Sequence, residues 1–251
     1  MKINSINILA LLLILFSGCH SNSNKVNEIP DAVATRVTLL QALCDDNIEK
    51  TKEILDSNPG IINEIAAPGQ ETFLFFCQSP KMLKLLIDHD ANLYAENVSG
   101  KLAVFEFARD SKMINTALNY GKYNINHKQK HGTQLIHTVC SINANPQLLE
   151  YLLKNGANPN ATSKRVSNPI FSAIYAFKNG GNAENAMIDL LLKYGAKVSS
   201  EEIKLINIKI ARREKYINFT SSEAVKQKQL IFLDELKRLK IKLKKYYSAK
   251  Q

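Results

Sequence analysis

The residues that could support metal or acid-base chemistry are two histidines near the middle of the chain. His127 and His131 lie four residues apart, separated by Lys128, Gln129 and Lys130. No Glu follows them in an H-E-x-x-H arrangement, and few other zinc-binding side chains lie nearby. This pattern favours a solvated loop over a metal site. We therefore predict no metal and no other cofactor.

The motifs of covalent and phosphoryl chemistry are missing from the sequence. It contains no G-x-S-x-G, no P-loop and no G-x-G-x-x-G after a strand. No pair of carboxylates has a spacing that suggests a glycosidase. We therefore expect a protein that is not an enzyme.

Composition indicates a folded chain with an uneven charge distribution. Of 251 residues, 45% are hydrophobic and 22% are charged, which is enough apolar surface to form a core and excludes an intrinsically disordered protein. Residues 1–160 carry 14 basic and 15 acidic side chains, whereas residues 161–251 carry 19 and 8. The positive charge therefore lies in the C-terminal third.

The first eighteen residues have the three regions of a secretory signal peptide. Lys2 supplies a positive charge, residues 8–16 form an apolar run, and the small residues Ser17 and Gly18 precede Cys19. The run is too short for a permanent membrane-spanning helix. A plain signal peptide cleaved elsewhere, or a hydrophobic N-terminus that is never cleaved, are the alternatives to processing at Cys19.

The segment from Leu15 to Cys19 also resembles the bacterial lipobox, with Phe16 in place of the usual Leu. The resemblance implies cleavage after residue 18 and acylation of Cys19, whose thioether carries a diacylglycerol with palmitate-type chains. Two or three acyl chains give stable membrane anchoring. Residues 19–30 are then the lipidated cysteine and a flexible tether. No Asp follows Cys19, which favours the periplasmic face of the outer membrane over the inner membrane.

The middle of the chain repeats itself. Aligning the sites of Phe75, Phe105, His137 and Phe171 gives periods of 30, 32 and 34 residues. Segments 71–77, 100–108, 132–140 and 166–174 share a first-half pattern, and segments 85–92, 151–160 and 190–197 share a second-half pattern. A chain with this periodicity is expected to form a stack of similar units, each burying its apolar stripe against the next.

This pattern resembles the ankyrin repeat over residues 37–198. The match at 131–160 is the most specific, because Gly132, His137, Leu152 and Gly156 fall where the family places them. The resemblance implies an all-α ankyrin-repeat solenoid of helix-turn-helix-loop units, with about five repeats over residues 31–198. Residues 38–63 match as a degenerate capping repeat, and the repeat at 100–126 is eroded. Stacked helices offer no deep pocket, which also argues against an enzyme.

Specific residues have expected roles within these units. Gly156 and Gly195 are expected to end helices in the left-handed conformation. His137 is expected to bind loop backbone and fix a turn. Cys44, Cys77 and Cys140 fall on or beside the inner face of first helices, which favours free core thiols; Cys44 and Cys77 are the pair to examine for a disulfide.

Residues 199–251 leave the repeat pattern and are expected to form a basic helical hairpin cap. Ser199-x-x-Glu202 and Thr220-x-x-Glu223 indicate two helix starts, with the helices joined at residues 218–219. The apolar seam from Phe232 to Tyr246 has heptad spacing, so a self-associating coiled coil is the alternative.

The basic residues of this segment have three possible uses. From Ser199 onward there are 14 Lys and Arg against 6 Asp and Glu. Nucleic acid is not an expected partner, because an exported protein rarely meets it. Contact with anionic lipid fits both the positive charge and the predicted location at a membrane. The other interpretation is that these residues form the solvated face of a capping helix.

The ankyrin resemblance implies a protein-protein interaction module in the bacterial envelope that binds another protein. In that family, partners bind the concave face made by first helices and projecting loops. The partner-binding candidates carried over by position are Glu96, Asn97, Lys128, Gln129, Lys130, His131, Ser163, Lys164 and Arg165. The last two loop tips are basic, which suggests an acidic partner surface. The alternative is an ankyrin effector that is delivered to a host cell, binds host proteins and keeps its N-terminus unprocessed.

Overall fold

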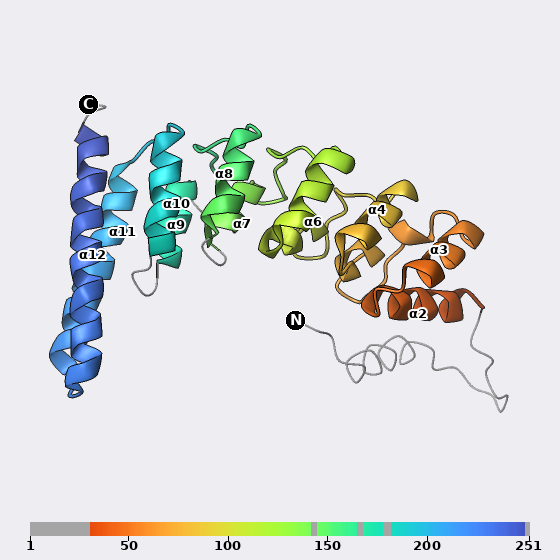
Figure 1. Cartoon of the computed structure of the whole chain (residues 1–251), viewed down its shortest axis with the longest axis horizontal. Helices are drawn as coiled ribbons and strands as arrows, with labels where there is room; N and C mark the ends of the chain where they lie inside the picture. Colours follow the sequence, from red (N-terminus) through yellow and green to blue (C-terminus); the bar gives the residue numbers. More distant parts are fainter. Residues whose placement is uncertain (1–30, 142–144, 165–167, 178–181, 249–251) are drawn as a thin grey trace. The chain divides into compact units, whose positions relative to one another are not determined.

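The computed structural model describes residues 31–141, 145–164, 168–177 and 182–248 (Figure 1). These residues form helices and loops without a named strand, which confirms the predicted all-α repeat solenoid. They fall into two compact units, which divide between Tyr123 and Asn124. The expected signal peptide, Cys19 and the tether lie outside the described residues.

Unit 1, residues 31–123, opens with a helical hairpin. Helices α2 (Asp31–Cys44) and α3 (Ile48–Ser57) pack against each other. Asn47 caps the start of α3, because its side chain accepts a hydrogen bond from the Lys50 N–H. The apolar side chains between the two helices are fully buried, including those of Leu39, Leu43 and Leu55. This hairpin occupies the place of the degenerate first repeat.

The next two repeats of unit 1 have short first helices. The first comprises the 3₁₀ helix η2 (Phe73–Phe76) and α4 (Pro80–Asp88). The second comprises α5 (Ala103–Glu106), η3 (Phe107–Arg109) and α6 (Ser111–Asn115), which continues as the π-helical turn η4 (Thr116–Tyr120). This π-turn coincides with the eroded Leu-pair segment of the sequence, where the helix ends irregularly.

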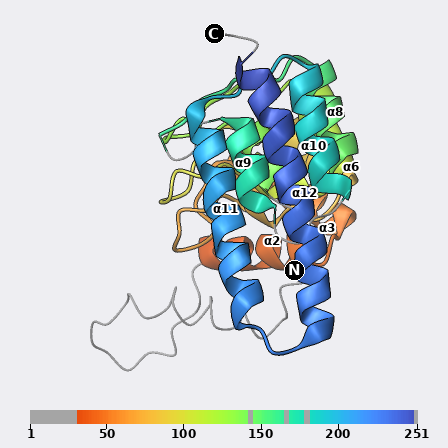
Figure 2. The same cartoon turned by 90° about the vertical axis from the view of Figure 1, so that its left-hand side faces the viewer.

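Unit 2, residues 124–248, contains three helical hairpins (Figures 1 and 2). An inner row consists of α7 (Leu135–Ser141), α9 (Pro169–Ala176) and α11 (Ser200–Phe219), in which α9 packs against both neighbours. An outer row consists of α8 (Pro146–Lys154), α10 (Asn182–Lys193) and α12 (Glu223–Ser248). Helices α8 and α9 begin with an Asn cap followed by Pro, a strong helix start.

Left-handed backbone residues mark the repeats along the chain. Each repeat ends its second helix at a positive φ, and the residues involved are Gly60, Asp90, Lys122, Gly156 and Gly195. The first four are separated by 30, 32 and 34 residues, the same periods that the sequence shows. The expected left-handed conformation of Gly156 and Gly195 is confirmed, with φ of 87° and 85°.

The C-terminal hairpin differs from the sequence prediction at its turn. The capping box of Ser199 and Glu202 at the start of α11 is confirmed. The predicted box at Thr220 is wrong, because Thr220 ends α11 and donates its N–H to the Tyr216 carbonyl. Helix α12 starts later, with Ser222 Oγ accepting from the Val225 N–H at 3.5 Å. Residues 218–219 therefore lie within α11 and do not form the joint.

The heptad seam of α12 packs inside the molecule. Phe232, Leu236, Leu239 and Leu243 are buried, and α12 packs along α11. The seam therefore packs against α11 within one chain. None of the helices in the described ranges is both long enough and apolar enough to cross a membrane.

Candidate functional site

Projecting loops of consecutive repeats are joined through their backbones. In unit 1, isolated antiparallel bridges pair Ile65 with Thr72 and Glu96 with Leu102. The Val98 N–H donates to the Gly69 carbonyl at 2.9 Å and so links the two loops. In unit 2, the Lys164 N–H donates to the His131 carbonyl at 3.0 Å in the same manner. Adjacent loops therefore present one continuous edge within each unit.

The candidates in unit 1 support their own loop. Asn97 Oδ1 accepts hydrogen bonds from the N–H groups of Ser99 and Lys101 at 3.1 Å each. Its amide donates to Glu71 Oε1 at 3.3 Å. Both Glu96 and Asn97 are half-buried. Asn97 is thus a loop-shaping residue, and its side chain has little freedom to bind a partner.

The candidates in unit 2 form an exposed basic edge. Lys128, Lys130 and Lys164 are exposed, whereas Gln129, His131 and Ser163 are half-buried. Gly132 closes the first loop with a φ of 79° and donates its N–H to the Gln129 carbonyl at 2.7 Å. Arg165 lies outside the described residues. We call Lys128, Lys130, His131 and Lys164 the basic loop surface.

His137 anchors this surface to the core. Its ring is 1% exposed, and Nδ1 accepts a hydrogen bond from the Gln134 N–H at 3.1 Å. Nε2 donates to the Ala161 carbonyl at 3.0 Å, at the foot of the following loop. Burial lowers the pKa of His137, because desolvation penalises the imidazolium. The expectation that His137 binds loop backbone is confirmed, and it does so as a neutral ring.

Asparagines provide a second link between repeats. Asn126 Nδ2 donates to the Gly156 carbonyl at 2.8 Å, and its Oδ1 accepts from the Asn158 N–H at 2.9 Å. Asn160 makes the same two bonds to the Gly195 carbonyl and the Lys197 N–H. In each case the carbonyl and the N–H belong to the turn that ends the second helix of the next repeat. These bonds fix the spacing of the repeats that carry the loops.

In unit 1 the same position holds an asparagine in one repeat and a tyrosine in the next. Asn63 bonds to the Asp90 carbonyl and the Asn92 N–H at 2.9 and 2.7 Å. Tyr94 occupies the equivalent place one repeat later, and its ring stacks on that of Tyr123 with centroids 5.1 Å apart. At this point an aromatic ring contact takes the place of the asparagine side chain.

A buried carboxylate joins the C-terminal hairpin to the last repeat. Glu202 is 0% exposed, and its Oε1 accepts from Asn168 Nδ2 at 3.0 Å. Its Oε2 accepts from the Ser199 N–H and hydroxyl, both at 2.6 Å. Asn168 also caps α9 by accepting from the Phe171 N–H. One carboxylate therefore ties the start of α11 to the start of α9.

The two units differ strongly in charge. Residues 124–251 contain 22 Lys and Arg against 9 Asp and Glu, a net charge of +13, whereas residues 1–123 have a net charge of −3. Several basic residues of α12 are paired: Lys237 with Glu214, Arg238 with Asp234, and Lys242 with Asp189. These ion pairs favour a solvated capping face over lipid contact for those three side chains.

The three described cysteines are free thiols. Cys77 and Cys140 are buried, Cys44 is half-buried, and Cys44 and Cys77 do not form a disulfide. Burial raises the pKa of the Cys77 thiol to about 12 and also raises that of Cys140. Neither thiol is suited to nucleophilic chemistry. In the described part of the chain, no three His, Cys, Asp or Glu side chains gather in a group that could hold a metal ion.

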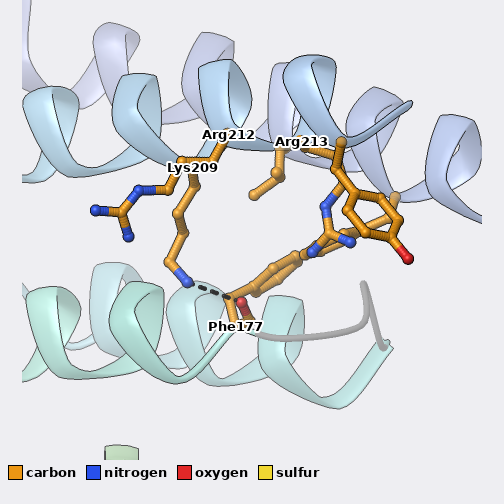
Figure 3. Close-up of a pocket in the computed structure, with 7 residues that line it drawn as sticks. Phe177, Lys209, Arg212 and Arg213 are labelled. Carbon is orange, nitrogen blue, oxygen red and sulfur yellow. Dashed lines mark hydrogen bonds between the residues drawn. The ribbon is translucent and has the colours of Figure 1, made fainter. Parts of the chain in front are cut away.

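Sequence reasoning missed a pocket beside α11. It has a volume of about 300 Å³ and is lined by Phe177, Lys209, Arg212, Arg213, Tyr216, Phe232 and Leu236. Figure 3 shows Lys209 directed from α11 toward Phe177. The basic and aromatic residues at positions 209, 212, 213 and 216 have the spacing of one helix face. That spacing was the one feature of the sequence that could have indicated the pocket, but a charged helix face usually indicates solvent exposure.

Comparison with known proteins agrees with this geometry at one repeat. No curated protein matches the chain significantly. Residues 131–164 match the family model of the ankyrin repeat. The matched segment contains α7, α8 and His137, together with His131 and Lys164 of the basic loop surface, whereas Lys128 and Lys130 lie just before it. The chain therefore carries an ankyrin repeat at residues 131–164, set within an all-α stack of helical hairpins.

Proposed function

We propose that this chain is a non-catalytic ankyrin-repeat module that captures a protein with an acidic surface through the basic loop surface of unit 2. Ankyrin repeats typically mediate binding between proteins. An acidic partner surface is inferred from the net charge of +13 on residues 124–251 and from the three exposed lysines on the loop edge. Complementary charge steers association and selects partners.

Charge reversal on the loops tests this proposal. Changing Lys128, Lys130, Lys164 and Arg165 to Glu should strongly reduce recovery of the partner in a pull-down from native cells. The control reverses four lysines away from these loops, namely Lys154, Lys193, Lys226 and Lys228, and should leave recovery unchanged. Equal recovery with both variants would refute the acidic-partner proposal.

We further propose that the chain is a lipoprotein of the bacterial envelope, on the periplasmic face and preferably of the outer membrane. The support is the order of charge, apolar run and small residues before Cys19. Mass spectrometry of the native protein should find a mature chain that begins at acylated Cys19, and Cys19→Ala should remain unprocessed. An intact Met1 would instead support the host-cell effector, which stays the alternative.

A further inference from the structure

The pocket beside α11 lies where the last repeat ends and the C-terminal hairpin continues. Phe177 is the C-cap residue of α9, whereas Arg213 and Tyr216 belong to the second half of the longer α11. The open space of about 300 Å³ is thus lined by the residue that ends α9 and by residues of α11 and α12 (Figure 3). It belongs to unit 2, as does the basic loop surface, but it shares no residue with that surface.

One side of the pocket is apolar. The rings of Phe177 and Phe232 stack with centroids 5.4 Å apart and an interplanar angle of 14°. Leu236 lies beside them and is fully buried. Phe177, Phe232 and Leu236 are only 1%, 4% and 0% exposed, so they form a rigid, covered base, and the apolar surface of the pocket that a ligand can reach is the ring of Tyr216.

The other side of the pocket is cationic and largely fixed in place. Lys209 Nζ donates to the carbonyls of Tyr175 and Phe177 at 3.0 Å each. The Arg213 guanidinium lies 4.3 Å from the Phe232 ring centroid and donates to Gln229. Because these two side chains are already ordered, an anion that binds them costs little additional conformational entropy.

Among the described residues, those that line the pocket include no Asp or Glu. The adjacent Glu214 pairs with Lys237 at 3.0 Å. Partial burial lowers the pKa of the Arg213 guanidinium by desolvation, which an incoming anion would offset. Arg212 completes the lining and is exposed, so its guanidinium is accessible to a ligand from solvent.

From this arrangement we infer that the pocket binds a carboxylate flanked by an aromatic or bulky apolar side chain, presented by a segment of the captured protein. The inference rests on the proposed function and adds a second contact to it. A guanidinium pairs with a carboxylate in a bidentate manner, while the exposed ring of Tyr216 contacts the neighbouring side chain. A free phosphate would use the cations alone and would not contact the exposed aromatic rings.

Exposed aromatic residues around the pocket extend the surface for such a segment. Tyr216 is 51% exposed, Tyr175 on α9 is 68% exposed, and Phe219 at the end of α11 is 79% exposed. Tyr175 and Tyr216 both belong to helices of the inner row. An extended peptide that enters the pocket would cover more apolar area on these rings than a small ion would.

Indole probes test the inference cleanly, since the chain contains no Trp. N-acetyltryptophan supplies a terminal carboxylate, acetyl-Glu-Trp-amide supplies a side-chain carboxylate, and N-acetyltryptophanamide is the neutral control. Each is titrated with the purified full chain, and binding is followed by indole fluorescence. At least one acidic probe should bind at least tenfold more tightly than the neutral one, and the stronger of the two identifies the source of the carboxylate.

Two variants on α11 assign the binding to the pocket. Arg212→Gln should weaken the acidic probe about tenfold, the loss expected for one charge-assisted hydrogen bond. Lys215→Gln makes the same charge change on the same helix outside the pocket lining and should have no effect. Equal binding of acidic and neutral probes, or equal loss in both variants, would overturn the inference.

Two further results separate the possible failures. If the acidic probes do not bind but wild type sediments with phosphatidylglycerol vesicles and Arg212→Gln does not, the pocket serves a lipid headgroup and the peptide inference is wrong. The titrations contain no partner protein, so a negative result there leaves the outcome of the loop charge reversal unaffected. The proposed function of the basic loop surface and the inference about the pocket can therefore be refuted independently.

Discussion

Replacing His137 with Ala should destabilise unit 2 by about 2–6 kcal/mol, because it leaves two buried backbone groups unpaired at about 1–3 kcal/mol each. These are the Gln134 N–H, 3.1 Å from Nδ1, and the Ala161 carbonyl, 3.0 Å from Nε2. The ring is 1% exposed, so water cannot replace either bond without opening the site. The second bond joins α7 to the loop of the matched repeat.

The same residue makes stability depend on pH. Its pKa in the folded chain is lowered by desolvation. Below the unfolded pKa of about 6.5, the unfolded chain binds a proton that the folded chain does not. The stabilisation that His137 contributes is therefore fully present above pH of about 6.5. It decreases as the pH drops toward the pKa of the folded chain, by at most about 1.4 kcal/mol per pH unit.

Urea unfolding of wild type and His137→Ala at several pH values, followed by circular dichroism, measures both effects. The difference between the two proteins should shrink below pH of about 6.5, since only wild type loses the contribution of His137. His131→Asn is the matched control, because the His131 ring is half-buried and lies in the preceding loop. The role assigned to His137 would be refuted if His137→Ala lowered the free energy of unfolding by less than about 1 kcal/mol, or if this free energy had the same pH dependence in both proteins.

Three further predictions concern packing. Glu202→Ala should lower the free energy of unfolding by about 3–5 kcal/mol, because it leaves three donors around a fully buried carboxylate unpaired. The control Glu201→Ala changes an exposed residue and should lower it by less than about 1 kcal/mol in the same urea titration. Asn160→Ala removes bonds to the Gly195 carbonyl and the Lys197 N–H and should cost about 1–2 kcal/mol by thermal denaturation; an unchanged midpoint would contradict the asparagine link. A thiol reagent should label half-buried Cys44 first and reach Cys77 and Cys140 only at the unfolding rate, and rapid labelling of Cys140 would show that α7 is not buried as described.

Local features of the sequence predicted the repeat fold well. The left-handed ends at Gly156 and Gly195 and the capping box of Ser199 follow from residue types that few other conformations accept. The role of His137 followed from its place in the ankyrin resemblance. Thr220 misled because the capping pattern was present, but α11 continues through Phe219 and Ser222 provides the later start.

Features that depend on long-range contacts could not be predicted. The pocket requires Phe177 and Phe232 to stack, although they lie far apart in the sequence. The asparagine at position 126 bonds to backbone thirty residues later, and its period alone does not name its partners. Among the binding candidates, the exposure of Lys128 and the internal bonds of Asn97 became evident only from the folded loops.

Lysine footprinting of the native complex tests most directly whether the loop edge of unit 2 is the binding surface. The protein is captured with its partner from native cells, acetylated, and compared by mass spectrometry with the protein alone. Lys128, Lys130 and Lys164 should be protected by the partner, while Lys154 and Lys193 on the outer row of helices should react as before. Protection confined to Lys154 and Lys193, with the loop lysines fully reactive, would contradict the account.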